Sequence, residues 1–258
     1  MNVNDMFSLA GKTAVVIGGG GVLAGEMSNG FARAGADVAV LDLNEKTAAE
    51  RAAEIRALGR RALGLGVDAT KKQALESARD RILAEFGSVD ILLNAAGINS
   101  GTPFFEIGEA EWHKILDVNL KSVFLACQVF GKVMVESGKG GSIINISSAS
   151  SGPPLSRVFT YGITKAGANQ ITQFLARELA PYKVRVNAIL PGFFPAEQNR
   201  QLLTPERTAQ IMTHTPMNRF GEACELVGAA VYLASEAASS FVTGSILRVD
   251  GGFLAMTI

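Results

Sequence analysis

Three side chains in the second half of the chain are spaced so that they could exchange a proton with a substrate. Tyr161 and Lys165 stand four residues apart, which puts both on one face of a helix. A positive charge beside a phenol stabilises the phenolate and lowers a pKa that starts at about 10. Tyr161 is therefore expected to act as a general acid and base. Ser148 closes an apolar run 13 residues earlier, and its hydroxyl could hydrogen-bond a carbonyl or an alcohol.

A glycine-rich segment, residues 18–25, follows the first apolar run and opens a helical pattern. Gly19, Gly21 and Ala24 fit the pattern G-x-G-x-x-G/A. Glycines in such a loop let a pyrophosphate approach backbone N–H groups at a helix N-terminus. A plain flexible turn is the alternative, but the place between a strand and a helix favours a dinucleotide site. The expected contacts of that site are Gly18, Gly20, Gly21, Val22 and Leu23.

An acidic residue, Asp42, ends the second predicted strand, 24 residues after Gly18. A carboxylate at that place can accept hydrogen bonds from the ribose hydroxyls of NAD, whereas the 2′-phosphate of NADP would meet its negative charge. Leu43 follows, and residues 18–25 contain no Arg or Lys to offset the charge. We therefore expect NAD as the cofactor. The alternative is a solvated acid that opens the loop Asp-Leu-Asn.

The elements around these residues alternate between short β-branched runs and longer helical patterns. This alternation predicts βαβ units and a parallel sheet with helices on both faces. The expected fold is a single α/β domain over residues 1–258, with a doubly wound parallel sheet of about seven strands. Strands are predicted at 13–17, 37–41, 61–67, 89–93, 142–146, 184–189 and 245–249, and helices from the glycine segment to 34 and at 45–58, 71–86, 109–136, 161–179 and 222–234.

Two proline-containing segments, 149–160 and 191–219, show little regular pattern. Both follow predicted strands, and ligands of open parallel sheets bind outside the carboxyl ends of the strands. Long loops in compact domains are often functional. We therefore expect a substrate loop at about 191–219.

Composition excludes several other classes. Lys plus Arg and Asp plus Glu both number 24, so the formal charge is zero and gives no footprint for nucleic acid. Two distant cysteines, Cys127 and Cys224, argue against a disulfide scaffold and a cysteine-based metal site. No secretory signal is apparent and no apolar run approaches the roughly 20 residues of a membrane span. We expect a cytoplasmic enzyme with a small-molecule substrate and no metal.

Taken jointly, these motifs resemble the short-chain dehydrogenase/reductase family over essentially the full chain. The resemblance implies a Rossmann-type fold. It also implies that Tyr161 donates or accepts the proton, that Lys165 lowers its pKa and binds the nicotinamide ribose, that Ser148 orients the substrate, and that Asn119 holds a water. Further implied contacts are Val67 and Asp68 with adenine, Asn94, Ala95, Ala96 and Gly97 at the central strand, and Pro191 and Gly192 beside the nicotinamide.

The sequence departs from the family pattern at two places. Ile17, Val22 and Ala24 replace the Thr and two Gly residues of the usual glycine loop. Valine disfavours positive φ, so the loop should follow a different path there. Ala196 stands where the family often has a Thr that contacts the carboxamide.

The segment after Pro191 resembles a sugar-acid branch of the family, close to the D-mannonate oxidoreductases (fructuronate reductases). Gln198, Asn199 and Arg200 offer hydrogen bonds for hydroxyls and a fork for a carboxylate, and Arg157 is a second carboxylate candidate. For each, a solvated loop residue is the alternative. The predicted reaction is NAD-dependent transfer of a hydride to or from a secondary alcohol or ketone of a sugar acid, similar to D-mannonate and D-fructuronate, or of a polyol. The alternatives are a 3-oxoacyl reductase and a non-catalytic nucleotide-binding protein, and the resemblance implies a homotetramer.

Overall fold

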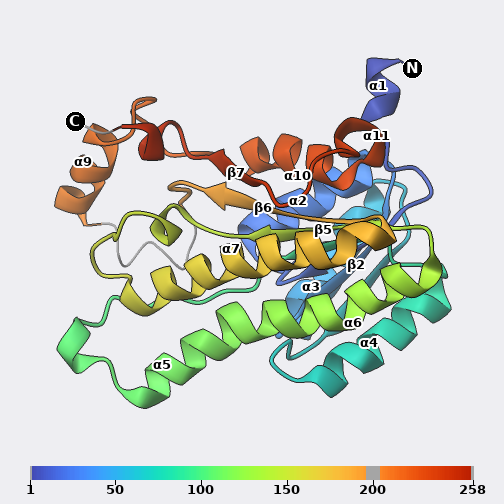
Figure 1. Ribbon diagram of the computed structural model, residues 1–258, viewed down its shortest axis with the longest axis horizontal. Helices are drawn as coiled ribbons and strands as arrows, with labels where there is room; N and C mark the ends of the chain where they lie inside the picture. Colours follow the sequence, from blue (N-terminus) through green and yellow to red (C-terminus); the bar gives the residue numbers. More distant parts are fainter. Residues whose placement is uncertain (1, 196–203, 257–258) are drawn as a thin grey trace.

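Seven parallel strands form one sheet in the computed structural model, which describes residues 2–195 and 204–256 (Figure 1). The strand order is β3-β2-β1-β4-β5-β6-β7, so the winding reverses between β1 and β4. This sheet confirms the predicted doubly wound fold, and a ligand is expected at the reversal. The strands are β1 Thr13–Ile17, β2 Asp37–Asp42, β3 Ala62–Gly66, β4 Ile91–Asn94, β5 Gly141–Ile146, β6 Val184–Pro191 and β7 Ile246–Val249.

Helices cover both faces of the sheet (Figure 1). One layer contains α2 Val22–Arg33, α3 Glu45–Ala57 and α10 Val227–Ala234, and the other contains α4 Lys72–Phe86, α6 Ser122–Ser137 and α7 Phe159–Leu179. Shorter helices are α1 Val3–Met6 and α11 Glu236–Ser239 at one end of the molecule and α9 Pro205–Thr213 at the other (Figure 1).

The central strands are apolar throughout because both of their faces are covered. Side chains alternate between the two faces of a strand. In β1, Val15 packs into the core under α4 and α6, whereas Ala14 and Val16 pack into the core under α2 and α10. Val15 stands in register with Ala39 of β2 and Leu92 of β4. This register carries the ends of β1, β2 and β4 to one edge of the sheet.

The long helical pattern predicted at 109–136 is divided in the structure. Helix α5 spans Glu109–Leu116, a π-helical turn spans Asp117–Lys121, and α6 follows directly. The stretch Glu109–Ser137 is long and apolar enough to cross a membrane by length and composition, but 56% of its most apolar window is buried within the protein. It is therefore accounted for as a core helix, with Val123, Leu125 and Phe130 packed against the sheet.

Helix α9 lies within the segment 191–219, for which the sequence pattern predicted no regular element. Thr204 caps the helix by accepting a hydrogen bond from Arg207 N, and Pro205 occupies the first helical position. Ser or Thr followed by Pro is a helix-start signal, because the missing N–H of proline needs no partner there. The expectation of an irregular segment was wrong for Pro205–Thr213.

Candidate active site

The glycine loop joins β1 to α2 at the sheet edge where the winding reverses. Gly18 has a φ of +77°, and a Cβ on it would lie 2.8 Å from the backbone of Ala96. Only glycine fits there, because both the conformation and the space exclude a side chain. Gly21 is the N-cap of α2 with extended backbone, and Val22 is the first helical residue. Val22 is not among the residues of positive φ, so the valine at this position is accommodated as the first residue of α2.

Asp42 ties the glycine loop to the loop after β2. Its Oδ2 accepts a hydrogen bond from Gly20 N at 3.1 Å and its Oδ1 accepts one from Asn44 N at 3.0 Å. The carboxylate thus lies beside the uncapped N-terminus of α2. Leu43 projects into solvent and is 78% exposed.

The end of β3 lies next to the end of β2. Val67 N donates to the carbonyl of Asp42 at 2.7 Å. Asp68 Oδ1 accepts from Thr70 N at 2.9 Å and Thr70 Oγ1 at 2.6 Å. The Thr70 hydroxyl holds the pKa of Asp68 below its usual range. Val67 and Asp68 are therefore placed on the same side of the glycine loop as Asp42, where the family resemblance puts the adenine.

The segment after β4 combines a core residue with residues of the site. Asn94 is buried and donates to Asn145 Oδ1 at 2.9 Å, and Asn145 donates to Thr172 Oγ1 at 2.9 Å. Asn94 thereby joins β4, β5 and α7, and its side chain supports the site from inside the core. Ala95 N donates to the carbonyl of Ile17 at 3.0 Å, and Ala96 backs Gly18.

Gly97 and Asn119 border the buried amine of Lys165. A Cβ on Gly97 would lie 3.7 Å from Lys165 Nζ and 3.6 Å from Asn119 Oδ1. Asn119, in the π-helical turn, accepts from Ile98 N at 2.8 Å and donates to the Ile98 carbonyl at 2.9 Å. Both polar ends of Asn119 thus hold the segment after β4, and its role in holding a water stays a prediction.

Ser148, Tyr161 and Lys165 come together at the carboxyl end of β5. Lys165 Nζ donates to the carbonyl of Ile146 at 2.8 Å and lies 5.5 Å from the centre of the Tyr161 ring. Burial raises the pKa of Tyr161, while a side-chain hydrogen bond with Ser148 acts in the opposite direction. Burial lowers the pKa of Lys165 to about 8. The net result is a raised pKa for Tyr161, because burial of the phenol outweighs the lowering expected from the ammonium of Lys165.

A cavity of about 120 Å³ contains Ser148 and Tyr161. Pro191 and Gly192 line it from the end of β6, and Leu23 lines it from α2. A Cβ on Gly192 would lie 2.7 Å from Asp250 Cα, so only glycine lets β6 pass that close to the turn after β7. Ser148, Tyr161 and the Pro191-Gly192 pair therefore line one pocket with Leu23 of α2, whereas Lys165 and residues 18–22 are not part of its lining.

Apart from Ser148, the residues that the sequence predicted to bind the substrate do not line the cavity of Ser148 and Tyr161 within the described part of the chain. Arg157 is exposed, has a φ of +64°, and lines a neighbouring cavity of about 680 Å³ with Phe104 and Phe159. Leu155 and Val158 line both this cavity and that of Ser148 and Tyr161. Gln198, Asn199, Arg200 and the departure at Ala196 lie outside the described residues.

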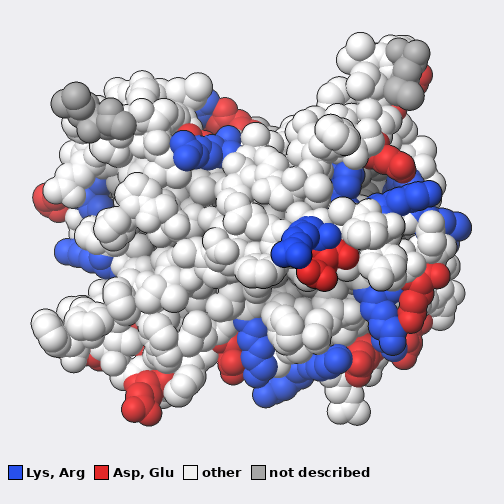
Figure 2. All heavy atoms as spheres, in the orientation of Figure 1, with Lys and Arg blue, Asp and Glu red and all other residues white. Residues whose placement is uncertain are grey.

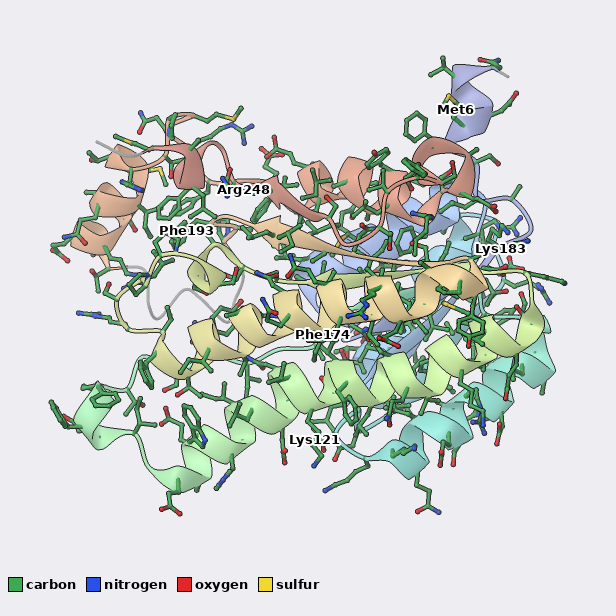
Figure 3. The ribbon with its side chains drawn as sticks, in the orientation of Figure 1. Met6, Lys121, Phe174, Lys183, Phe193 and Arg248 are labelled. Atoms are coloured by element: carbon green, nitrogen blue, oxygen red, sulfur yellow. The ribbon has the colours of Figure 1, made fainter. Side chains whose placement is uncertain are left out.

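Several residues of the pocket escaped the sequence analysis, among them Phe193 and Arg207. Both line the cavity of Ser148 and Tyr161. Phe193 lies at the sheet edge near the C-terminal segment and packs edge-on against Phe253 at 5.0 Å (Figure 3). Arg207 comes from α9, whose Thr-Pro start was the available signal.

These features fit a dinucleotide. The N-terminus of α2 has no side-chain cap, so its N–H groups remain for a pyrophosphate. A Cβ on Gly21 would meet only the carbonyl oxygen of Gly18, at 3.4 Å. Gly97 leaves space beside Lys165 Nζ, where a ribose hydroxyl can accept a hydrogen bond.

Known proteins resemble this chain over nearly its whole length. Residues 21–254 match the family described as enoyl-(acyl carrier protein) reductase. The 2-dehydro-3-deoxy-D-gluconate 5-dehydrogenase of Escherichia coli (strain K12) is 40% identical over 250 residues, covering 96% of this chain and 98% of that one.

Two solved structures are similar over their whole length. A gluconate 5-dehydrogenase from Burkholderia cenocepacia J2315, in complex with NADP and tartrate, has a TM-score of 0.95 and 34% identity, covering 99% of this chain and 100% of that chain. A Haemophilus influenza protein with bound NAD, provisionally assigned as a D-mannonate oxidoreductase, has a TM-score of 0.92 and 34% identity over 99% of both chains.

The doubly wound sheet, the glycine loop and the Ser148–Tyr161–Lys165 arrangement thus occur in a chain that matches these proteins from end to end. The protein is an oxidoreductase of the short-chain dehydrogenase/reductase family.

Proposed function

We propose that the protein is an NAD-dependent dehydrogenase that interconverts a secondary alcohol and a ketone of a sugar acid. The observation that carries the proposal is the single pocket that Ser148 and Tyr161 share with Leu23 of α2 and the Pro191-Gly192 pair. The names of similar proteins, gluconate 5-dehydrogenase among them, support a sugar acid rather than a neutral polyol. We propose residues 191–219 as the substrate loop of a single catalytic domain, and a cytoplasmic location in keeping with the composition.

In this mechanism Tyr161 holds the proton that the substrate oxygen exchanges. Ser148 donates to or accepts from the same oxygen and keeps it next to the phenol. A nicotinamide dinucleotide bound at the glycine loop supplies the hydride chemistry. Lys165, whose Nζ lies beside Gly97, would hold the ribose of that dinucleotide, and it adds a positive charge beside the phenol. Because that charge favours the phenolate, Lys165 keeps more of Tyr161 in the deprotonated form, which can accept the proton of the alcohol during oxidation.

The choice of NAD rests on Asp42. Its carboxylate lies at the end of β2 beside the N-terminus of α2, held by Gly20 N and Asn44 N. A 2′-phosphate in that place would meet a negative charge. The similar structures include one with NADP and one with NAD, so cofactor choice in this chain depends on its own residues at this position.

We expect the purified protein to reduce NAD in the presence of a sugar acid. The assay follows the absorbance of reduced nicotinamide with D-gluconate, D-mannonate, 2-dehydro-3-deoxy-D-gluconate, sorbitol and a 3-hydroxyacyl substrate. The proposal is supported if, among these compounds, a sugar acid gives the highest kcat/KM. Fastest turnover of the acyl substrate would assign a 3-oxoacyl reductase instead, and binding of NAD with no turnover of any compound would favour a nucleotide-binding protein.

We also propose that the protein is a homotetramer, and the surface of α6 and α7 supports this. Phe124 of α6 and Phe159, Ile163 and Phe174 of α7 are large apolar side chains exposed on these helices. Phe174 is labelled in Figure 3, and Figure 2 shows that the surface over the first half of α7 is almost free of charged side chains. Apolar patches of this kind mark protein–protein contacts.

Sedimentation velocity at micromolar concentration should therefore show a tetramer for the wild type. Phe174→Glu should shift the distribution towards smaller species, because burying a carboxylate in an interface is unfavourable. The control is Leu58→Glu, which places the same charge on an exposed apolar residue at the end of α3. A wild type that sediments only as a monomer would reject the tetramer.

A further inference from the structure

Arg207 brings a positive charge to the pocket of Ser148 and Tyr161. It lies in the first turn of α9, whose start is fixed by the Thr204 cap and Pro205. The side chain is half-buried and lines the same cavity of about 120 Å³ as the two hydroxyl residues. It also lines an adjoining cavity of about 420 Å³ that contains Gln210 and His214. Arg207 thus stands where these two cavities meet.

Among the described residues, no other Lys, Arg, Asp or Glu lines either cavity. None of the ion pairs formed between described residues includes Arg207. Among the described residues this half-buried guanidinium therefore has no carboxylate partner. A guanidinium at the wall of a cavity can bind an anion that enters it.

The guanidinium is held in one orientation. Nη1 donates to Ser156 Oγ and Nη2 donates to the Ser156 carbonyl, both at 2.9 Å. These bonds use one N–H of each terminal nitrogen, so three of its five donors, including Nε–H, have no partner among the described residues. A fork of such donors matches the two oxygens of a carboxylate. Because Ser156 already fixes the plane, little side-chain entropy is lost when the anion binds.

The local electrostatics favour an anion as well. Burial and the positive charge of Arg157 both lower the pKa of Arg207. A bound carboxylate would offset the unfavourable proximity of the two like charges. Arg157 is exposed and lines the neighbouring cavity of about 680 Å³, whereas Arg207 lines the cavity of Ser148 and Tyr161 itself.

We infer that Arg207 binds the carboxylate of the substrate, with Ser156 as its positioning residue. This inference rests on the proposed function and adds the residue that selects acids over neutral sugars. The substrate's secondary alcohol would lie at Tyr161 and its carboxylate at Arg207, both of which line the same cavity.

The test is steady-state kinetics of Arg207→Ala and Arg207→Lys with whichever of D-gluconate, D-mannonate and 2-dehydro-3-deoxy-D-gluconate the wild type turns over fastest. Loss of a charge-assisted pair is expected to raise KM for the acid by about 10- to 150-fold in Arg207→Ala. KM for NAD should stay at the wild-type value. Arg207→Lys should recover only part of the loss, because an ammonium cannot form the fork. Adding guanidinium chloride at millimolar concentration should lower KM of Arg207→Ala, which a merely structural arginine would not permit.

The matched control is Arg79→Ala on α4, which removes a guanidinium that pairs with Asp80 far from the pocket. An unchanged KM for the acid in both Arg207 variants would overturn the inference and leave the proposed function standing. Equal increases in KM for the acid and for NAD, with no rescue by guanidinium, would assign Arg207 a structural role and overturn it too. If the wild type turned over none of the sugar acids, that result would reject the proposed function before any variant is compared.

Discussion

Replacing Tyr161 with phenylalanine should lower kcat/KM by about 10²- to 10⁴-fold, the range of general acid–base catalysis. Phenylalanine keeps the ring and its packing but removes the phenolic proton. It also removes the side-chain hydrogen bond with Ser148. NAD affinity, measured by quenching of protein fluorescence or by calorimetry, should stay close to the wild-type value because the glycine loop and Asp42 are unchanged.

The control for this variant is Tyr182→Phe. Tyr182 is half-exposed at the end of the short helix after α7. Its replacement by phenylalanine removes a phenolic hydroxyl that lies outside the pocket. It should retain wild-type turnover. If Tyr161→Phe kept kcat/KM within about tenfold of the wild type, less than general acid–base catalysis supplies, the proton would have to be exchanged by another group.

The second large effect concerns cofactor choice. Opposing like charges at a binding interface cost several kcal/mol, so the wild type should prefer NAD over NADP by roughly 10²- to 10³-fold in kcat/KM. Asp42→Asn removes the charge and keeps one acceptor oxygen for Gly20 N or Asn44 N. Asp42→Asn and Asp42→Ser should both reduce the ratio of kcat/KM for NAD to kcat/KM for NADP, because activity with NADP should rise and activity with NAD should fall. Paired kinetics with the two cofactors at saturating substrate measure the ratio.

Because Asp42 also ties two loops together, the melting temperature of each variant has to be recorded alongside the kinetics. Glu50→Gln provides the matched control, since it removes one negative charge from an exposed position of α3. It should leave the ratio unchanged. Equal use of NAD and NADP by the wild type would contradict the assigned role of Asp42.

Local patterns account for the parts of the fold and site that the sequence predicted. The strand β1, Gly18 and Asp42 are each signalled by a short run of residues at fixed spacing. Tyr161 and Lys165 are signalled by one helical turn. Gly18 and Asp42 lie at strand ends and Tyr161 and Lys165 in the first two turns of α7, so the order of elements along the chain already brings them to one edge of the sheet.

Other parts depend on contacts between distant segments. Asn94 reads as a cofactor residue by resemblance, yet its amide is used in a core network with Asn145 and Cys127. Arg207 reaches the pocket only because α9 folds back over the strand ends, and a nine-residue helix has too few turns to show a clear period. Burial of the Tyr161 phenol, which raises its pKa, is likewise a property of the packed site.

The π-helical turn at Asp117–Lys121 limits how this enzyme can be stabilised. A π turn carries one more residue than a regular helical turn, and such turns are frequent at functional sites. Deleting one residue there would restore α-helical bonding and keep α5 and α6 nearly in phase, but it would redirect the side chains within the turn, and Asn119 would leave the Ile98 peptide that it holds. Selection for heat resistance alone would favour the shorter helix, whereas selection for turnover would retain the extra residue. The length of this helix is therefore a trade-off between stability and activity, and libraries with single-residue deletions at 117–121 would separate the two.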